Sequence, residues 1–330
     1  MDFISVFKKM MELFFIIVIG FATYRAGVIN SDVKKSLTKV VLKISLPCTI
    51  LSSVMNAAFL PNIKEIGRIV LVAFLSYVVY FVIAKISGKL LGLKGKQKGA
   101  AEFALIFSNV GFVGYPVTYA IFGPDSVFYT CIFNLPFNVV CYSLGVMLLN
   151  AEDKASKKKG STSETLSDNK SDKDLSGRIN FLKLMLTPAL ISSIIALVMA
   201  LINWQGPKLI GEMVETVGAI TTPGALLIIG CALAELELSQ MFNNWKVYVL
   251  SIISVLVTPI IAFITLSPLA GGDMLLIGEA VIISGMPVAT AGTMLCVEYG
   301  GDERFMAQLT FVSTVLSLVT IPLFAVWLSI

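Results

Sequence analysis

The sequence contains no histidine in its 330 residues. This absence excludes histidine-based catalytic triads, HExxH zinc sites and imidazole proton relays. Charged residues are also scarce, at 14% of the chain, where about 25% is usual for soluble domains. The net charge is only +4. Because loop lysines account for it, the charge gives no reason to expect a nucleic-acid partner.

Cysteine-based chemistry is equally poorly represented. No C-x-x-C pair occurs, and all the cysteines lie in apolar runs, which is typical of small buried hydrophobic residues. The sequence has no Walker A pattern and no GxGxxG motif, so it indicates neither ATP-driven transport nor binding of a dinucleotide. We therefore expect no cofactor, no metal site and no enzymatic activity. The cysteines are Cys48, Cys131, Cys141, Cys231 and Cys296.

Apolar residues dominate what remains, since aliphatic, aromatic and cysteine side chains make up 56% of the chain. One soluble core cannot absorb so many, because a globule must cover its surface with polar groups. The bilayer is the remaining solvent, and about 20 consecutive apolar residues span its hydrocarbon core. The sequence predicts an all-α membrane protein with ten transmembrane helices, at 10–28, 37–55, 66–90, 100–122, 127–149, 181–202, 217–236, 247–266, 274–297 and 305–329.

A hydrophilic stretch divides these spans into two equal groups. Residues 150–180 are rich in Ser, Lys and Asp, which is typical of a flexible, solvated linker. Residues 1–149 and 181–330 then form two five-helix halves. Because five is odd, the second half starts on the opposite side of the membrane from the first. If the halves are related, they form an inverted-topology repeat, as in many secondary transporters.

Lysine and arginine are distributed unevenly among the loops, and cytoplasmic loops usually hold most of them. With the N-terminus outside, the basic loops around Lys34 and Lys94 and the linker 150–180 all fall inside. Lys8 and Lys9 argue the other way. We expect a multi-pass protein of the cell membrane, with both termini outside and the linker in the cytoplasm.

Helix-breaking residues occupy matching positions in the two halves. Span four contains Ser108-Asn-Val-Gly-Phe-Val-Gly-Tyr-Pro116, and span nine contains Ser284-Gly-Met-Pro-Val-Ala-Thr-Ala-Gly292. Proline removes a backbone donor and glycine lowers helix propensity. Unwound backbone is tolerated at this depth only inside protein or beside a water-filled cavity. Simple kinks are the alternative, but a matched pair favours a substrate site, where positive helix N-termini attract anions.

These motifs resemble those of one known family. The run Asn109-Val-Gly-Phe-Val-Gly-Tyr-Pro116 is similar to the Asn-x-Gly-Phe-x-Gly-x-Pro signature of the auxin efflux carrier family. The segments 286–290, 298–302, 313–322 and 46–51 also fit that family, so the resemblance covers all ten spans. Prokaryotic members are associated with organic anions such as malate and malonate, and plant members move indole-3-acetate.

The resemblance implies an architecture. Spans four and nine should cross at their unwound prolines, as in sodium/proton antiporter and bile-acid symporter folds. Spans one, two, six and seven should form a scaffold through which members make homodimers, and the other spans a moving transport domain. Asn109 matches the family asparagine that contacts the substrate carboxylate. Span nine has Ser284 and Gly285 near its break instead of an obvious matching asparagine.

Ionisable residues within spans are functional candidates by default, because each costs at least about 2.5 kcal/mol at the bilayer centre. Glu102 lies about one turn inside span four, where it either pairs with a lysine such as Lys98 or couples transport to an ion. Glu279 lies about two turns before Pro287 and is a candidate to carry a proton. Asn134 and Asn138 share one face of span five, where they either line the cavity or bond to a neighbouring helix.

We therefore expect a secondary transporter that moves small organic anions, carboxylates, by alternating access. A proton- or ion-coupled dicarboxylate permease is one alternative, and an anion channel is another. Expected partners are the anion, lipid, a coupling proton or sodium ion, and a second copy of the chain. Glu102 and Glu279 are the ion-coupling candidates. The expected substrate-binding residues are Asn109, Gly111, Gly114, Tyr115, Pro116, Asn134, Asn138, Ser284, Met286, Pro287 and Thr290.

Overall fold

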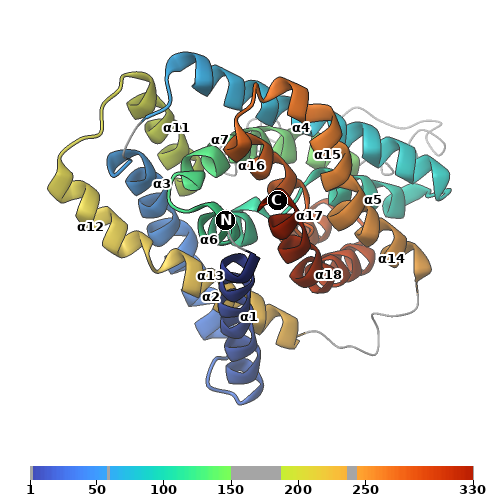
Figure 1. The fold of residues 1–330 in the computed structure, drawn as a ribbon. Helices are drawn as coiled ribbons and strands as arrows, with labels where there is room; N and C mark the ends of the chain where they lie inside the picture. The colour runs from blue at the N-terminus through green and yellow to red at the C-terminus, as the bar shows by residue number, and fades with distance from the viewer. Residues whose placement is uncertain (1–2, 58–59, 150–186, 236–243, 330) are drawn as a thin grey trace, which may run out of the picture.

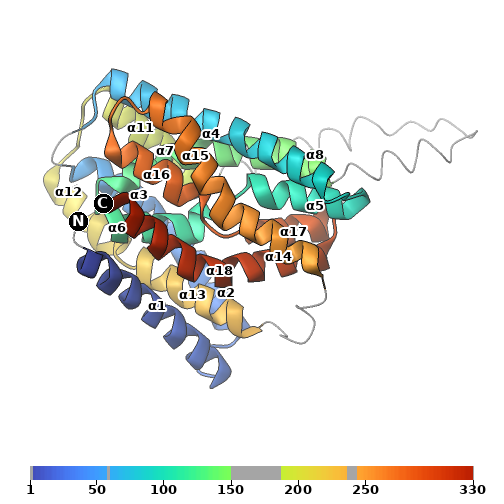
Figure 2. The same ribbon diagram turned by 45° about the vertical axis from the view of Figure 1, so that its right-hand side comes forward.

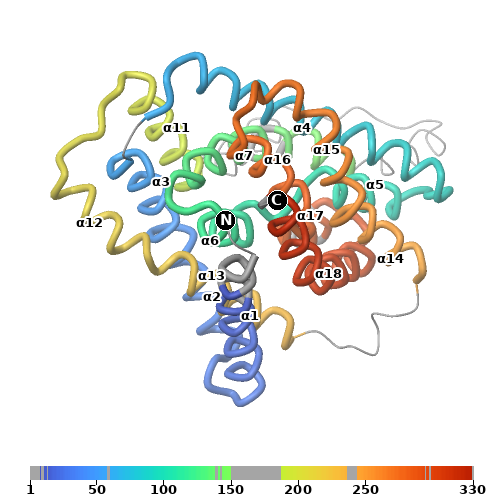
Figure 3. Tube along the Cα trace, in the orientation of Figure 1, coloured from blue at the N-terminus to red at the C-terminus, as the bar shows by residue number. Residues whose placement is uncertain are grey.

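A computed structural model describes residues 3–57, 60–149, 187–235 and 244–329 (Figure 3). These residues form helices, with no strand among them beyond one isolated β-bridge. The first half contains α1 Phe3–Arg25, α2 Ser31–Val40, η1 Val41–Ser45, α3 Leu46–Met55, α4 Ile63–Leu90, α5 Gly95–Ile106, η2 Val110–Gly114, α6 Tyr115–Phe122, α7 Ser126–Val140, η3 Cys141–Gly145 and α8 Val146–Leu149. The second half contains α11 Pro188–Leu201, α12 Lys208–Gly218, α13 Thr221–Glu235, α14 Trp245–Ile252, η5 Ile253–Val257, α15 Thr258–Leu266, η6 Ser267–Leu269, α16 Met274–Ser284, α17 Ala291–Tyr299 and α18 Glu303–Ser329.

Several of these helical segments are suited to a membrane. Within the described ranges, five are long and apolar enough to cross a bilayer, and the other apolar helices, such as Val110–Phe122 and Met274–Ser284, are shorter. The all-helical membrane architecture expected from the sequence is therefore present. The count of ten spans and the inverted repeat stay predictions, and the predicted linker 150–180 lies outside the described residues.

The helices pack in two groups (Figures 1 and 2). In the first group, α1 lies along α13, and α3 packs against α11 and α12. Glycines allow the first of these contacts, because a Cβ added at Gly230 would overlap the carbonyl oxygen of Ile17 and one at Gly20 would overlap that of Leu227. In the second group, α4 packs against α5 and α7, α15 against α16, and α14 against α18. These groups contain the spans expected to form scaffold and transport domain, respectively.

Prolines inside the helices are accommodated by wider turns. Three of the π-helical turns, η1, η2 and η5, each end two residues before a proline, namely Pro47, Pro116 and Pro259. A proline lacks the N–H of the normal helical bond and its ring crowds the preceding turn, so a turn with i→i+5 bonding relieves both problems. The expectation that Gly111, Gly114 and Pro116 lie in unwound backbone is therefore wrong, since these residues continue the helix from η2 into α6.

The chain does unwind in both predicted helices, between α5 and η2 and between α16 and α17. The two gaps run antiparallel and bond to each other. The backbone N–H of Asn109 donates to the carbonyl of Pro287 at 2.7 Å, and the N–H of Ala289 donates to the carbonyl of Phe107 at 3.0 Å. Each gap thus supplies hydrogen-bond partners that hydrocarbon cannot. The breaks expected in spans four and nine are present, and they lie against each other.

Helix α18 completes this crossing with one side chain. The backbone N–H of Val288, in the middle of the second gap, donates to Oγ of Ser313 at 3.0 Å. The Ser313 hydroxyl donates in turn to the Thr310 carbonyl of its own helix. Ser313 is fully buried, so water does not replace it.

Replacing Ser313 with alanine should destabilise the protein through this backbone group. The Ser313→Ala variant leaves the Val288 N–H buried without its acceptor, which costs about 1–3 kcal/mol. The measurement is the midpoint of thermal unfolding of the purified protein in detergent. Ser317→Ala is the matched control, because the buried Ser317 hydroxyl donates only within α18, to the carbonyl of Thr314. Equal shifts for the two variants would contradict the role given to Ser313.

Candidate functional site

Asn109 stands at the point where the first gap becomes helix again. Its side-chain oxygen accepts a hydrogen bond from the N–H of Phe112 at 3.3 Å, which makes it the N-cap of η2. The side chain is 6% exposed. Cap and backbone bonds therefore fix the position of this residue, while its amide nitrogen remains a donor that can serve a ligand.

Four helix ends meet around the crossing. The C-terminal ends of α5 and α16 lead into the gaps, and the N-terminal ends of η2 and α17 lead out of them. Helix N-termini carry partial positive charge and free N–H groups, which favour anions. Thr290, the residue before α17, is half-buried and its side chain makes no capping bond. The second helix start thus lacks the side-chain cap that Asn109 gives to the first.

The other predicted site residues are placed around these ends. Met286 and Pro287 lie in the second gap and are buried. Ser284 ends α16 and donates its hydroxyl to the carbonyl of Val281. Tyr115 is buried at the start of α6, with Asn134 of α7 close to its hydroxyl. Of these residues, Met286 and Pro287 lie in the second gap and Ser284 lies directly before it, whereas the side chain of Asn138 lies outside what the structure describes.

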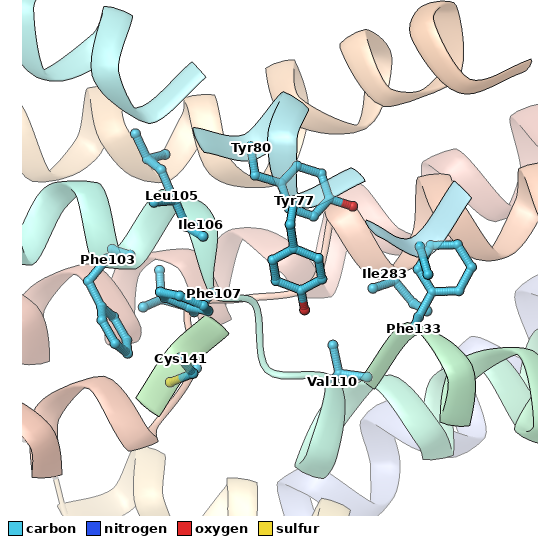
Figure 4. Close-up of a cluster of buried hydrophobic side chains, with 14 of the residues drawn as sticks. Tyr77, Tyr80, Phe103, Leu105, Ile106, Phe107, Val110, Phe133, Cys141 and Ile283 are labelled. Atoms are coloured by element: carbon cyan, nitrogen blue, oxygen red, sulfur yellow. The ribbon is translucent and has the colours of Figure 1, made fainter. Parts of the chain in front are cut away.

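Aromatic side chains pack against the first gap (Figure 4). The ring of Phe107 lies 4.7 Å from that of Phe103, 5.8 Å from Phe137 and 6.3 Å from Tyr77, measured between centroids. Figure 4 shows Tyr77 beside the extended link that leads from Phe107 to Val110. This packing holds the gap within protein and away from lipid.

An apolar cleft of about 490 Å³ reaches the crossing at Pro287. Its walls come from α1, α13 and α18 and from the η2–α6 segment, with side chains such as Ile17, Val113 and Leu226. The hydroxyls of Thr314 and Ser317 also line it but donate to carbonyls of α18. The cleft therefore lies between the two packing groups and suits the apolar part of a ligand.

A larger polar vestibule of about 950 Å³ opens between α3, α6 and the α12–α13 segment. A neighbouring cleft of about 640 Å³ shares three of its lining residues, so the two are continuous. Glu65, Asp125 and Glu215 line this combined space, and within the described ranges no lysine or arginine does. The vestibule is therefore acidic and does not attract anions from its side.

Glu102 is an ion-paired residue in this structure. The carboxylate is 2% exposed, and its Oε2 lies 2.7 Å from Nζ of Lys85. Lys98 approaches the other oxygen at 3.9 Å. The sequence left open whether Glu102 forms a structural ion pair or couples transport to an ion. This geometry favours the ion pair, with Lys85 of α4 as the nearer partner.

Glu279 is buried without such a partner. It is 0% exposed, and among the described residues no ion pair reaches it. Its Oε2 accepts a hydrogen bond from the hydroxyl of Thr130 at 3.1 Å, and that hydroxyl lies 2.7 Å from the hydroxyl of Thr118. The other carboxyl oxygen has no hydrogen-bond partner in the described structure. This group is the more favourable candidate to exchange a proton.

Sequence reasoning missed the two threonines and the specific role of Ser313. One signal was present for the threonines, because Thr118 and Thr130 lie at similar distances on either side of the Gly123-Pro124 turn between α6 and α7. Two helices joined by a short turn bring such residues to the same depth. No comparable signal in the sequence pairs Ser313 with Val288.

The sequence of this chain is similar to those of two archaeal transporters and matches one family profile. An uncharacterised transporter of Methanocaldococcus jannaschii is 24% identical over 315 residues, which cover 93% of this chain and 94% of that protein. An uncharacterised transporter of Methanothermobacter thermautotrophicus is 22% identical over 330 residues, 99% of each chain. The profile of the membrane transport protein family matches residues 5–325. The chain is therefore a multi-pass membrane transport protein, and it belongs to this family, that of the auxin efflux carriers.

Proposed function

We propose that the protein is a secondary transporter that carries small organic anions across the cell membrane by alternating access. The observation that carries the proposal is the pairing of the two gaps, where Asn109 bonds to Pro287 and Ala289 to Phe107. This pairing brings two helix N-termini to one point inside the bundle. Broken helices around such a point are the usual substrate site of inverted-repeat transporters.

The substrate class follows from the groups at this point. Helix N-termini and the Asn109 amide donate hydrogen bonds and attract negative charge. Among the residues described at the crossing and its apolar cleft, no arginine or lysine is present. Recognition then rests on dipoles and amides, which suits a carboxylate whose remaining atoms occupy the cleft. Malate, malonate and indole-3-acetate are suitable probes, because relatives in the family are associated with them.

Movement would occur between the two packing groups. The apolar cleft has one wall from α1 and α13 and another from α6 and α18, so sliding of one group past the other would open and close it. The group of α1, α3, α11, α12 and α13 would be the fixed scaffold, through which two copies form a homodimer. A channel would need no such movement, and current steps from single molecules would identify it.

Charge favours export as the direction. The vestibule acids Glu65, Asp125 and Glu215 lower the concentration of anions at that mouth, so they disfavour both binding and rebinding of an anion from that side. A membrane potential of 100 mV, inside negative, adds about 2.3 kcal/mol per elementary charge in the direction of export. Export requires the vestibule to be extracellular, as the distribution of basic residues predicts.

Asn109→Asp should strongly reduce the rate of transport and keep the fold. Aspartate keeps the oxygen that caps η2 but has no amide nitrogen, and its charge repels a carboxylate. We expect at least a tenfold lower initial rate of carboxylate transport into proteoliposomes, roughly the loss of one charge-assisted hydrogen bond. The unfolding midpoint should stay close to that of the wild type.

Asn109→Ala and Asn62→Ala serve as controls for this experiment. Alanine at 109 removes both cap and donor, so it should lower stability as well as transport. Asn62 caps α4 at the surface, and its loss should lower stability alone. Undiminished saturable transport by Asn109→Asp would remove the role proposed for the amide.

Orientation gives an independent prediction. The two ends of the chain lie near one end of the bundle, and α8, which precedes the linker, lies at the other (Figure 2). A cysteine in place of Ser161 in the linker should react with a membrane-impermeant maleimide only after the cells are permeabilised. One in place of Ser329 near the C-terminus should react in intact cells. The parent protein with its native cysteines gives the background, and the reverse pattern would contradict the proposed orientation.

A further inference from the structure

The buried carboxyl of Glu279 takes no part in the proposed function described above. Burial removes the water that stabilises a carboxylate, and a charge in the membrane interior needs a counter-charge or a proton. Within the described residues no lysine or arginine pairs with it. Its one hydrogen bond comes from Thr130. The group therefore has a local reason to bind a proton, and none to hold a permanent charge.

The neighbouring hydroxyls form a chain from this carboxyl to the crossing. Glu279 of α16 contacts Thr130 of α7 at 3.1 Å, and Thr130 contacts Thr118 of α6 at 2.7 Å. The Thr118 hydroxyl donates to the carbonyl of Gly114 at 3.0 Å. Gly114 ends η2, the helix that Asn109 caps. Two threonine side chains thus connect the carboxyl to the helix that leaves the first gap.

We propose that Glu279 takes up and releases one proton in each transport cycle, and that this proton reverses the direction of the hydroxyl chain. With the carboxyl protonated, its O–H donates to Thr130, Thr130 donates to Thr118, and Thr118 donates to Gly114. With the carboxylate, Thr118 donates to Thr130 and Thr130 to Glu279, so the Gly114 carbonyl loses this donor. Only the carboxyl O–H bond forms or breaks, and the proton comes from water and returns to it.

The proposed proton would enter from the vestibule. Tyr129, one residue before Thr130, lines the vestibule and donates its hydroxyl to Asp273 at 3.1 Å. Asp273 is the N-cap of α16, and Glu279 follows it by six residues, about 9 Å along the helix. The acids at this mouth repel anions, as described above, but attract protons. The same feature thus disfavours entry of the substrate and favours entry of the coupling ion.

Titratable side chains lie on four of the six elements that pack against α16, the helix of Glu279. The elements packed against α16 are α4, α6, α7, η2, α15 and α18. Of these, η2 and α15 contain no titratable side chain. Tyr115 of α6 and Tyr129 of α7 lie close enough to sense the charge of Glu279. Helix α4 also carries Tyr80, which lies beside Ser284, Lys85, which pairs with Glu102, and Arg68, which donates to the carbonyl of Ala270. The other titratable side chains of these helices are Lys64, Glu65, Tyr77 and Lys89 of α4, Tyr119 of α6, Cys131 of α7, and Glu303 and Arg304 of α18.

A proton fits this place better than a sodium ion. The hydroxyls of Thr118 and Thr130 are 2.7 Å apart, which is the separation of two oxygens that share a hydrogen. A metal ion between them would have to push them apart and recruit further oxygens. The proposal rests on the proposed transport function, since the proton is assigned to the same cycle.

The first test is the pH dependence of carboxylate transport in proteoliposomes that contain a trapped pH-sensitive dye. Wild-type carboxylate transport should be accompanied by proton movement in the opposite direction, and its rate should change by up to about tenfold per pH unit on one side of the titration midpoint. Glu279→Gln keeps the shape and donates from its amide to Thr130, which fixes the chain in the protonated direction. The transport rate of Glu279→Gln should vary less than about twofold with pH. No proton movement should accompany its carboxylate transport.

Three controls separate coupling from folding. Glu102→Gln, a second buried acid but an ion-paired one, should lower stability and keep the pH dependence. Thr130→Val should displace the pH profile, and Thr130→Ser, which restores the hydroxyl, should return it. A wild-type rate that follows sodium and not pH, or an unchanged profile in Glu279→Gln, would overturn the inference and leave the transporter assignment standing.

A second measurement does not depend on finding the substrate. The difference in melting temperature between wild type and Glu279→Gln should change across pH 5–9, because only the wild type gains or loses the proton. A constant difference would overturn the inference. A protein that moves none of the three carboxylates would count against the proposed function alone, since the melting comparison still decides the role of Glu279.

Discussion

The structure depends on one constraint, which is that hydrocarbon offers no hydrogen-bond partner to an interrupted helix. The chain meets it by placing its two gaps against each other, so that Asn109 and Ala289 donate to carbonyls of the opposite gap. The hydroxyl oxygen of Ser313 accepts a hydrogen bond from the backbone N–H of Val288, which lies between the two paired residues of its gap. The same arrangement collects helix N-termini inside the bundle. The solution to a folding problem therefore also creates the place where we propose that the anion binds.

Charge inside the bundle is handled in two ways. Glu102 is balanced by Lys85 and is fixed as long as that pair holds. Glu279 contacts the hydroxyl of Thr130, which contacts that of Thr118, and a hydroxyl acts as donor or as acceptor, so either protonation state finds a partner. An ion pair suits a static support, whereas a hydroxyl chain suits a group that changes charge. This contrast separates the structural acid from the one to which we assign a coupling proton.

The sequence predicts the two breaks because proline and glycine cluster at matching places in the two halves. It misplaces the unwound residues by about one turn, since the gap precedes η2 while Gly111 and Pro116 remain helical. A π turn absorbs the missing donor of a proline, and no local pattern distinguishes that outcome from unwinding. Likewise, the partner of Val288 comes from a helix 25 residues away, which only tertiary packing determines.

The most direct test of the central claim is protection of the crossing by substrate. Gly111 is half-buried and has no heavy atom within 4 Å of an added Cβ, so Gly111→Cys should fold and react with a small methanethiosulfonate. Gly67→Cys, equally uncrowded on α4, is the control. Saturation with a carboxylate that the same sample transports should slow the reaction at position 111 several-fold and leave position 67 unchanged. An equal rate at position 111 with and without that carboxylate would contradict binding at the crossed gaps.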